Sequence, residues 1–210
     1  MRGIVCAGGE GPGPEVLKKI AKGADLLAAA DSGVAAAEGA GLKADWVIGD
    51  MDSLDDPGRL EKYPQDRIVR FTHDKDFTDT ELAIALLREK GCDEIWISGG
   101  GGGRIDHLFA IRSLFERDDP PDRWFPGTEE IRCLGDGRNL AAVLPAGSRV
   151  SVFPLGREPW KAASTGLKWP LDGVAWEKGG FGISNVAVEG SFAIRSIQGR
   201  FMVFMPMVFE

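Results

Sequence analysis

The sequence predicts an α/β domain followed by an all-β domain. In the first 125 residues, short apolar segments alternate with stretches of helical periodicity, which is typical of a mostly parallel sheet. Later in the chain, short apolar segments are separated by turns that contain Gly, Pro or Asn, as in a β-sandwich. The polar, proline-containing segment Asp118–Arg123 separates the two patterns. We therefore expect an α/β domain over 1–125 and a sandwich over 126–210.

The first domain is expected to be Rossmann-like. Apolar runs predict strands at Arg2–Ala7, Asp25–Ala30, Trp46–Ile48, Arg67–Phe71 and Glu94–Ser98. Helical spacing predicts helices at Pro14–Lys22, Val34–Gly41, Pro57–Lys62, Thr78–Lys90 and Arg104–Arg117. The Thr78 helix has the clearest pattern, because Thr78 and Glu81 have capping-box spacing and Gly91 supplies a stop. Folds of this class bind ligands at the carboxyl ends of their strands.

The second domain is expected to contain strands and no helix. Its apolar segments predict strands at Ile131–Leu134, Leu140–Val143, Arg149–Phe153, Gly182–Val188, Phe192–Ser196 and Phe201–Val208. No convincing helical pattern follows Leu114. These short strands predict a sandwich or an open barrel.

The composition narrows the class of protein. Of the 210 residues, 43% are hydrophobic and 27% are charged, which is close to the average for globular proteins. A net charge of −7 argues against a general nucleic-acid binder, which would carry a basic stripe. No apolar stretch reaches bilayer length, and the first apolar run is too short for a signal sequence. Cys6, Cys92 and Cys133 lie far apart, as expected for reduced thiols in a cytoplasmic protein.

The first acidic segment directly follows the strand Trp46–Ile48. Asp50 and Asp52 are therefore expected at the sheet edge where ligands bind. Crowded carboxylates repel one another unless a cation lies between them, and ligands that offer only oxygen favour Mg²⁺ over zinc. Alternatively, one aspartate caps the helix near Pro57 and the other is solvated.

A second acidic segment, Asp74–Asp79, lies just before the helix that begins near Thr78. The N-terminus of a helix suits phosphate oxygens, and Lys75 could place a positive charge on them. Helix capping explains Thr78 and Asp79 well but explains Asp76 poorly. Because Mg²⁺ held by carboxylates usually accompanies substrate phosphates, the two segments together predict an enzyme that handles a nucleotide.

Two further segments carry candidate binding residues. The run Gly99–Gly103 follows a strand and lets the backbone approach a phosphate closely, although a tight strand-to-helix turn also explains much of it. Arg104, directly after it, is a better candidate for phosphate because guanidinium donates two hydrogen bonds. Trp169, between Lys168 and Pro170, either stacks on a flat or cationic ring or covers the β core.

Taken in order, these segments resemble the thiamine pyrophosphokinase (thiamine diphosphokinase) family. That family's signature is Gly-Asp-Phe-Asp-Ser, an Asp-x-Asp-x-Thr-Asp helix start, Gly-Gly-Arg-x-Asp-His, Gly-Leu-Lys-Tyr/Trp and Ser-Asn. The corresponding segments here are Gly49–Ser53, Asp74–Asp79, Gly102–His107, Gly166–Trp169 and Ser184-Asn185. Their shared order is far more specific than any single motif.

The resemblance implies a homodimer of α/β and β-sandwich domains, with the active site between domains of the two subunits. It implies transfer of diphosphate from ATP to the hydroxyl of thiamine, giving thiamine diphosphate and AMP. Asp50, Asp52 and Asp79 would bind Mg²⁺, with Asp76 beside them as a fourth catalytic aspartate.

The same resemblance assigns the substrate contacts. Residues of the ATP site would be Asp31, Lys75, Thr78, Arg104 and Asp106. Residues of the thiamine site would be Trp169, Ser184 and Asn185. Diphosphoryl transfer needs positioning and charge neutralisation more than strong base assistance, which any of the aspartates could give.

Two other functions remain open at this point. The same site could transfer diphosphate to another heterocyclic alcohol, such as a pterin. Alternatively, the fold could be a non-catalytic binder of thiamine or a nucleotide. Trp169 and the Ser184-Asn185 pair favour thiamine, and the set of aspartates favours an enzyme, because a metal cluster is of little use to a pure binder.

Overall fold

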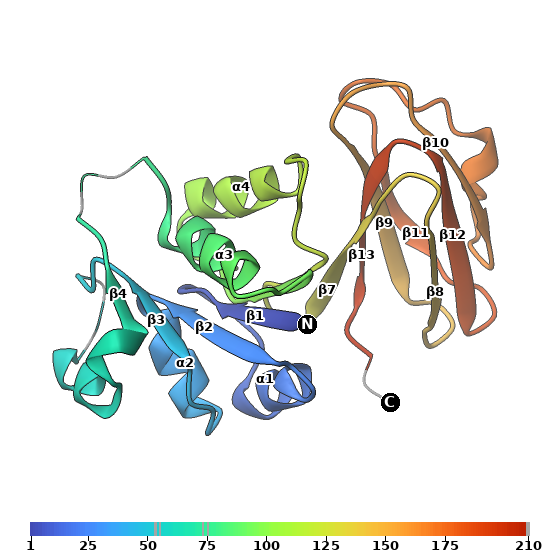
Figure 1. Cartoon of the computed structure of the whole chain (residues 1–210). Coiled ribbons are helices and arrows are strands. Elements are labelled where there is room, and N and C mark those ends of the chain that lie inside the picture. Colours follow the sequence, from blue (N-terminus) through green and yellow to red (C-terminus); the bar gives the residue numbers. More distant parts are fainter. Residues whose placement is uncertain (53, 55, 73, 75, 209–210) are drawn as a thin grey trace. The chain divides into compact units, whose positions relative to one another are not determined.

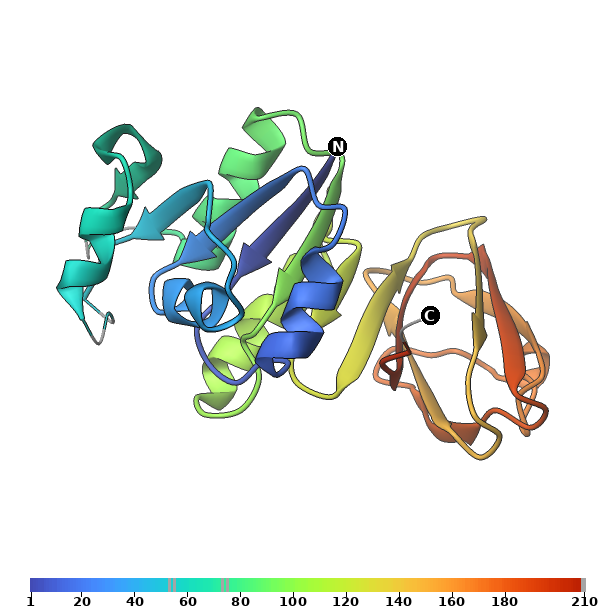
Figure 2. The ribbon, with the colours of Figure 1, turned by 90° about the horizontal axis from the view of Figure 1, so that it is seen from below.

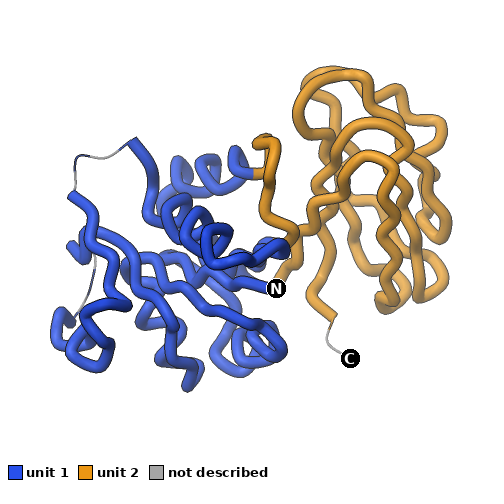
Figure 3. The backbone as a smooth tube through the Cα atoms, viewed as in Figure 1, with its two compact units in different colours: residues 1–114, 124–127 blue, residues 115–123, 128–210 orange. Residues whose placement is uncertain are grey.

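The computed structural model describes residues 1–52, 54, 56–72, 74 and 76–208. Within them the chain forms two compact units, which are coloured separately in Figure 3. Unit 1 contains residues 1–114 and 124–127, and unit 2 contains residues 115–123 and 128–210. The α/β class of the first part and the antiparallel β structure of the second are both confirmed.

Unit 1 is a sheet with helices on both faces. Its elements are β1 (Arg2–Cys6), α1 (Pro14–Ala21), β2 (Leu26–Ala30), α2 (Gly33–Gly39), β3 (Trp46–Gly49), the 3-10 helices η1 (Pro57–Lys62) and η2 (Gln65–Arg67), β4 (Ile68–Arg70), α3 (Asp79–Glu89), β5 (Glu94–Ser98), α4 (Ile105–Leu114) and β6 (Arg123–Phe125). The strand order is β6-β5-β1-β2-β3-β4, and the pairs β5–β1, β1–β2, β2–β3 and β3–β4 are parallel. Helices α1 and α2 cover one face of this sheet and α3 covers the other (Figures 1 and 2).

Burial explains why these segments become strands. Strands β1, β2, β3 and β5 are almost entirely buried, as expected for a parallel sheet with helices on both faces. Ala83 and Leu87 of α3 pack against Val5, Ala28 and Ile48 of the sheet. The capping box predicted for α3 is present, since Thr78 accepts from the Glu81 amide and Glu81 accepts from the Thr78 amide. The segment at Pro57, predicted as a helix, forms 3-10 turns in which Asp56 accepts from the Gly58 amide.

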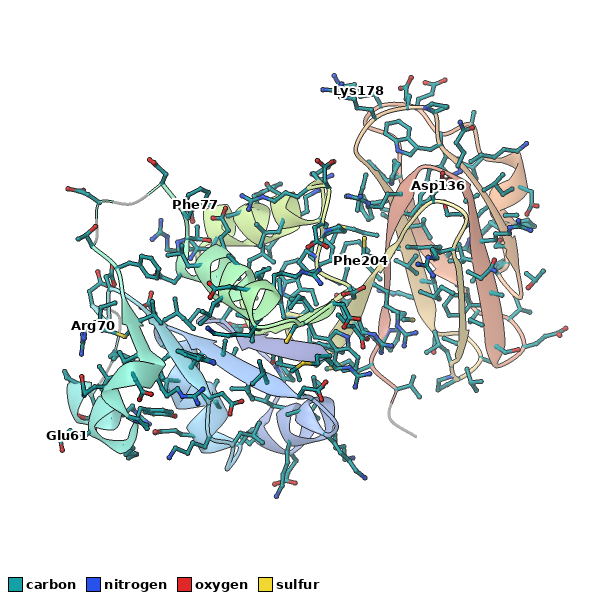
Figure 4. All side chains as sticks on the ribbon, in the orientation of Figure 1. Glu61, Arg70, Phe77, Asp136, Lys178 and Phe204 are labelled. Carbon is teal, nitrogen blue, oxygen red and sulfur yellow. The ribbon has the colours of Figure 1, made fainter. Side chains whose placement is uncertain are left out.

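Unit 2 is a sandwich of two antiparallel sheets. Its elements are β7 (Glu129–Leu134), β8 (Asn139–Val143), β9 (Arg149–Leu155), β10 (Lys161–Thr165), the 3-10 helix η3 (Leu171–Gly173), β11 (Gly182–Val186), β12 (Ser191–Gln198) and β13 (Arg200–Pro206). One sheet has the order β11-β9-β13-β7 and the other has the order β10-β12-β8. Buried side chains of both sheets form a common core that includes Val152, Ile194, Phe201 and Val203. Figure 4 shows the side chains as sticks on the ribbon, with Phe204 of β13 labelled.

The sequence did not predict strands β6 and β10. Strand β10 contains Ala162, Ala163 and Ser164, which have low intrinsic strand preference, and its pairing with β12 across the sheet stabilises it instead. Within the described residues, no helix is long and apolar enough to cross a membrane.

Candidate functional site

Three neighbouring parallel strands of unit 1 end at the same edge of the sheet. Strand β2 is followed at once by Asp31, β3 by Asp50, and β4 by the segment that leads to α3. The Asp31 amide donates to the Ile48 carbonyl (2.9 Å), and the Phe71 amide donates to the Gly49 carbonyl (3.1 Å). The ends of these strands are therefore tied together, which brings their acidic loops to one place.

Asp31, Asp50 and Asp52 form a cluster of carboxylates at this edge. Each offers an oxygen, and these oxygens all lie within 4.8 Å of one another. The Met51 amide donates to Asp31 Oδ1 (3.3 Å), and the Asp52 amide donates to Asp50 Oδ1 (3.2 Å). Asp31 and Asp50 are half-buried and Asp52 is exposed, so the cluster is open to solvent on one side. Three carboxylates at this spacing suit a hard divalent cation.

The backbone beside the cluster adopts conformations that most residues avoid. Asp31 and Met51 have positive φ values of 45° and 66°, and Gly49 has a φ of 149°. Backbone strain of this kind persists only where the surroundings enforce it, and it is common at functional sites. A Cβ atom on Gly49 would lie 1.8 Å from Asp31 Oδ1. Gly49 therefore gives Asp31 the room to reach the end of β3.

The electrostatics of the cluster also favour a bound cation. The pKa of Asp31 is raised to about 7, first by burial and then by its hydrogen bond to Asp79 and the charges of Asp79 and Asp50, while the hydrogen bond from the Met51 amide acts in the opposite direction. A bound cation would stabilise the ionised form of a carboxylate that lies among other carboxylates. The donor set, which consists of carboxylate oxygens, fits Mg²⁺.

The N-terminus of α3 contributes Asp79 to this region. Asp79 is the first residue of α3, is half-buried and bonds to Asp31. Thr78 already uses its side chain in the capping box with Glu81 (Oγ1 to Oε2, 2.7 Å). Asp76 is exposed, and Lys75 lies outside the described residues.

The glycine run is explained mainly by packing. The amides of Gly99, Gly100 and Gly101 donate to the carbonyls of Phe125, Gly8 and Glu10, at 3.0, 2.8 and 2.8 Å. A Cβ on Gly99 would lie 2.3 Å from the Ala7 carbonyl oxygen, and one on Gly101 would lie 1.9 Å from the Pro126 carbonyl oxygen. These three amides already have acceptors within the fold, so the tight-turn interpretation holds for this part of the run.

Arg104 and Asp106 lie on the exposed start of α4. Arg104 Nη2 and Nε donate to the two carboxylate oxygens of Asp106, at 2.6 and 3.2 Å. This pair lowers the pKa of Asp106 below its usual range. Both side chains face solvent, so a phosphate can reach the guanidinium.

In unit 2, Trp169 has an exposed indole on a fixed backbone. The residue is 53% exposed, so about half of its surface is open to solvent. The Lys168 ammonium lies 4.6 Å from the centre of the ring and covers one of its faces. Ser184 is exposed, has a φ of 59°, and its amide donates to Ser151 Oγ (3.1 Å).

Asn185 differs from its neighbour because it is buried. It is 5% exposed, and its side chain bonds to the backbone of Trp169 rather than facing solution. The structure thus places Ser184 and Trp169, but not Asn185, where a ligand can touch their side chains.

Asp31 is the residue whose surroundings the sequence did not anticipate. The resemblance assigned it to the ATP site, and in the structure its carboxylate lies with those of Asp50 and Asp52. Its position directly after β2, beside the strand that precedes Asp50, was the available signal.

Comparison with known proteins gives the same family for both units. Residues 17–119 match the model of the thiamin pyrophosphokinase catalytic domain. Residues 141–198 match the model of the thiamin pyrophosphokinase vitamin B1 binding domain. The first range contains the carboxylate cluster, and the second contains Trp169 and Asn185.

Individual relatives are more distant. Thiamine pyrophosphokinase 1 of Oryza sativa subsp. japonica is 28% identical over 173 residues, which are 73% of this chain. The chain spans 63% of the length of that relative, which is less than two thirds.

Solved structures show the same fold over nearly the whole chain. The thiamin pyrophosphokinase of Geobacillus thermodenitrificans has a TM-score of 0.77 at 23% identity, covering 99% of this chain and 98% of that one. The enzyme of Candida albicans has a TM-score of 0.74 at 16% identity, covering 98% and 89%. Because two family models together match most of its residues, this chain belongs to the thiamin pyrophosphokinase family.

Proposed function

We propose that this protein is a thiamine diphosphokinase that transfers diphosphate from ATP to the hydroxyl of thiamine. The observation that carries the proposal is the cluster of Asp31, Asp50 and Asp52 within a chain that matches both family models. We further propose that unit 1 binds ATP and Mg²⁺ and that unit 2 binds thiamine.

In this proposal Asp50, Asp52 and Asp79 hold Mg²⁺, and Asp31 completes the acidic set. The crowding of these carboxylates and the raised pKa of Asp31 support such a role. When bound, Mg²⁺ would neutralise charge on the phosphate oxygens. Asp76 would lie near the phosphates as a further aspartate.

The reaction itself forms one bond and breaks another. The thiamine hydroxyl oxygen bonds to the β-phosphorus of ATP while the bond from that phosphorus to the α–β bridging oxygen breaks. AMP leaves, and the hydroxyl proton passes to one of the aspartate carboxylates. Because a primary alcohol needs little base assistance in such a transfer, positioning supplies most of the rate.

The remaining residues bind and orient the substrates. In this proposal Arg104 grips phosphate oxygens with its two donors, and Asp106, Thr78 and Lys75 complete the set of ATP-binding residues. The open face of Trp169 takes a flat ring of thiamine, whose positive charge suits an aromatic surface. Ser184 is exposed near this aromatic segment and offers a hydroxyl to the ligand.

We also propose a cytoplasmic homodimer. The three cysteines are unpaired, which supports a reducing compartment. The dimer rests on the family resemblance, and sedimentation analysis at several protein concentrations tests it.

A pterin or another heterocyclic alcohol is the second candidate substrate. The exposed indole of Trp169 would accept any flat ring, and this observation keeps the alternative open. A non-catalytic binder is disfavoured because the carboxylate cluster has no evident use without a metal.

Substitution of Asp52 tests the metal-dependent part of the proposal. Asp52→Asn should abolish AMP formation from ATP, thiamine and Mg²⁺ while the protein stays folded. The matched control is Asp66→Asn, which removes one exposed carboxylate from unit 1 at η2. Equal turnover by the two variants would remove Asp52 from the site.

A further inference from the structure

One buried side chain forms hydrogen bonds with both the amide and the carbonyl of Trp169. Asn185 Oδ1 accepts from the Trp169 amide (3.1 Å), and Asn185 Nδ2 donates to the Trp169 carbonyl (2.6 Å). Asn185 is 5% exposed, whereas Trp169 is 53% exposed. A buried amide therefore fixes the main chain of a residue that is itself about half exposed.

Other hydrogen bonds fix the chain on both sides of Trp169. The Lys168 amide donates to the Val186 carbonyl, and the Val188 amide donates to the Gly166 carbonyl, each at 2.9 Å. These bonds pair the Trp169 segment with β11 and the residues after it. The backbone of this segment is therefore anchored on both sides of Trp169.

A second group of bonds closes the segment beyond Trp169. The Leu171 amide donates to Ser164 Oγ (2.9 Å), and the Ser164 amide donates to Asp172 Oδ2 (3.1 Å). Ser164 and Asp172 thus join the two ends of the segment that carries Trp169.

The hydrogen bonds of Asn185 leave it little capacity to bind a ligand. Its Oδ1 accepts from the Val186 amide (2.8 Å) as well as from the Trp169 amide, which fills both lone pairs. One N–H of its Nδ2 is used by the Trp169 carbonyl. To bind a ligand directly, the Asn185 side chain would have to give up hydrogen bonds that it needs as a buried amide. These bonds suit Asn185 to act through Trp169 rather than on a ligand.

We propose that Asn185 is a positioning residue that presents the open face of Trp169 to the flat ring of the substrate. This role rests on the proposed function, and it replaces the expectation that Asn185 touches thiamine. The Lys168 ammonium lies over one face of the indole, so the substrate ring would stack on the other face. Holding the ring in advance lowers the entropy lost on binding.

A double-mutant cycle tests the role, with the variants Asn185→Ala, Trp169→Ala and the double variant. Asn185→Ala should raise KM for thiamine about tenfold, while kcat at saturating thiamine changes about twofold or less. In the Trp169→Ala background the same substitution should leave KM unchanged. An equal rise in KM in both backgrounds would mean that Asn185 acts on its own, and would overturn the proposal.

A matched control separates this effect from a general loss of stability. Ser196 is also buried in unit 2, and its Oγ donates to the Gly199 carbonyl (2.6 Å). Ser196→Ala should lower the melting temperature but leave KM for thiamine unchanged. If Asn185→Ala does not fold, Asn185→Asp takes its place, because it keeps the acceptor but loses the donor to Trp169.

A readout that needs no catalysis separates failure of this role from failure of the proposed function. The emission of Trp169 in each protein is obtained by subtracting the spectrum of the same protein with Trp169→Phe. Asn185→Ala should lower its anisotropy, and unchanged anisotropy would overturn the role. A parent protein that forms no AMP with thiamine contradicts the proposed function instead, whatever the anisotropy shows.

Discussion

Gly49 and Asp31 approach so closely that any side chain at position 49 would collide with the Asp31 carboxylate. A Cβ atom there would lie 1.8 Å from Oδ1 and 2.6 Å from Cγ of Asp31. Since Gly49 ends β3 and Asp31 follows β2, this approach joins two neighbouring strands at the edge that carries the carboxylate cluster.

Gly49→Ala should disrupt the carboxylate cluster. The collision and the φ of 149° predict a loss of about 1–3 kcal/mol in the free energy of unfolding. They also predict a fall in Mg²⁺-dependent turnover of about tenfold or more, because Asp31 must move. The control is Gly39→Ala in α2, where a Cβ meets nothing within 4 Å and stability should hold or rise. Equal melting temperatures for the two variants would contradict this account.

Asp31→Asn should stabilise the protein without metal and weaken its response to Mg²⁺. Removing one of several crowded negative charges should raise the free energy of unfolding by about 1 kcal/mol at this partly exposed site. Added Mg²⁺ should then raise the melting temperature less than it does in the parent protein, because the acidic set around the ion loses one negative charge. Thermal unfolding with and without Mg²⁺ measures both effects. With Asp66→Asn as the control, equal Mg²⁺ responses in the two variants would remove Asp31 from the site.

Arg104→Lys should impair ATP binding specifically. Lysine keeps the charge but loses the two-donor geometry, so KM for ATP should rise about tenfold while KM for thiamine holds. Arg112→Lys, at the other end of α4, is the matched control. Steady-state kinetics with each substrate varied in turn gives the values. An unchanged KM for ATP in the Arg104 variant would mean that Arg104 serves only its pair with Asp106.

Thr78→Ala should cost stability through the lost cap, by about 1 kcal/mol, whereas Thr78→Ser should not. Glu81→Ala removes the other half of the same capping box and serves as the comparison. If Thr78 also binds ATP, KM for ATP should rise in the Thr78→Ala variant beyond its value in the Glu81→Ala variant. Equal KM values would leave Thr78 with a capping role alone.

Local sequence patterns predict the helices and buried strands of unit 1 well. The capping box at Thr78 and Glu81 works because both residues lie within one turn of the same helix. Strand β10 was not predicted because it is stabilised by pairing with β12, which lies about thirty residues away in the chain. Local patterns carry no information on such a pairing.

The same contrast between local patterns and long-range contacts applies to the candidate site. Asp50 and Asp52 are recognisable because they follow a buried strand directly. The place of Asp31 beside them depends on the parallel pairing of β2 with β3 and on the glycine that ends β3. The role of Asn185 depends on its burial, which its exposed neighbour Ser184 does not share. The motif alone does not distinguish a residue that touches the ligand from one that holds such a residue.

The most direct test of the account is AMP release from ATP and Mg²⁺, measured with thiamine and, in parallel, with a hydroxymethylpterin. We predict AMP release that depends on thiamine, together with an equal amount of thiamine diphosphate. AMP release with the pterin alone would keep the diphosphate transfer and replace the substrate. Absence of AMP with either acceptor, in a protein that still binds thiamine, would contradict the catalytic account.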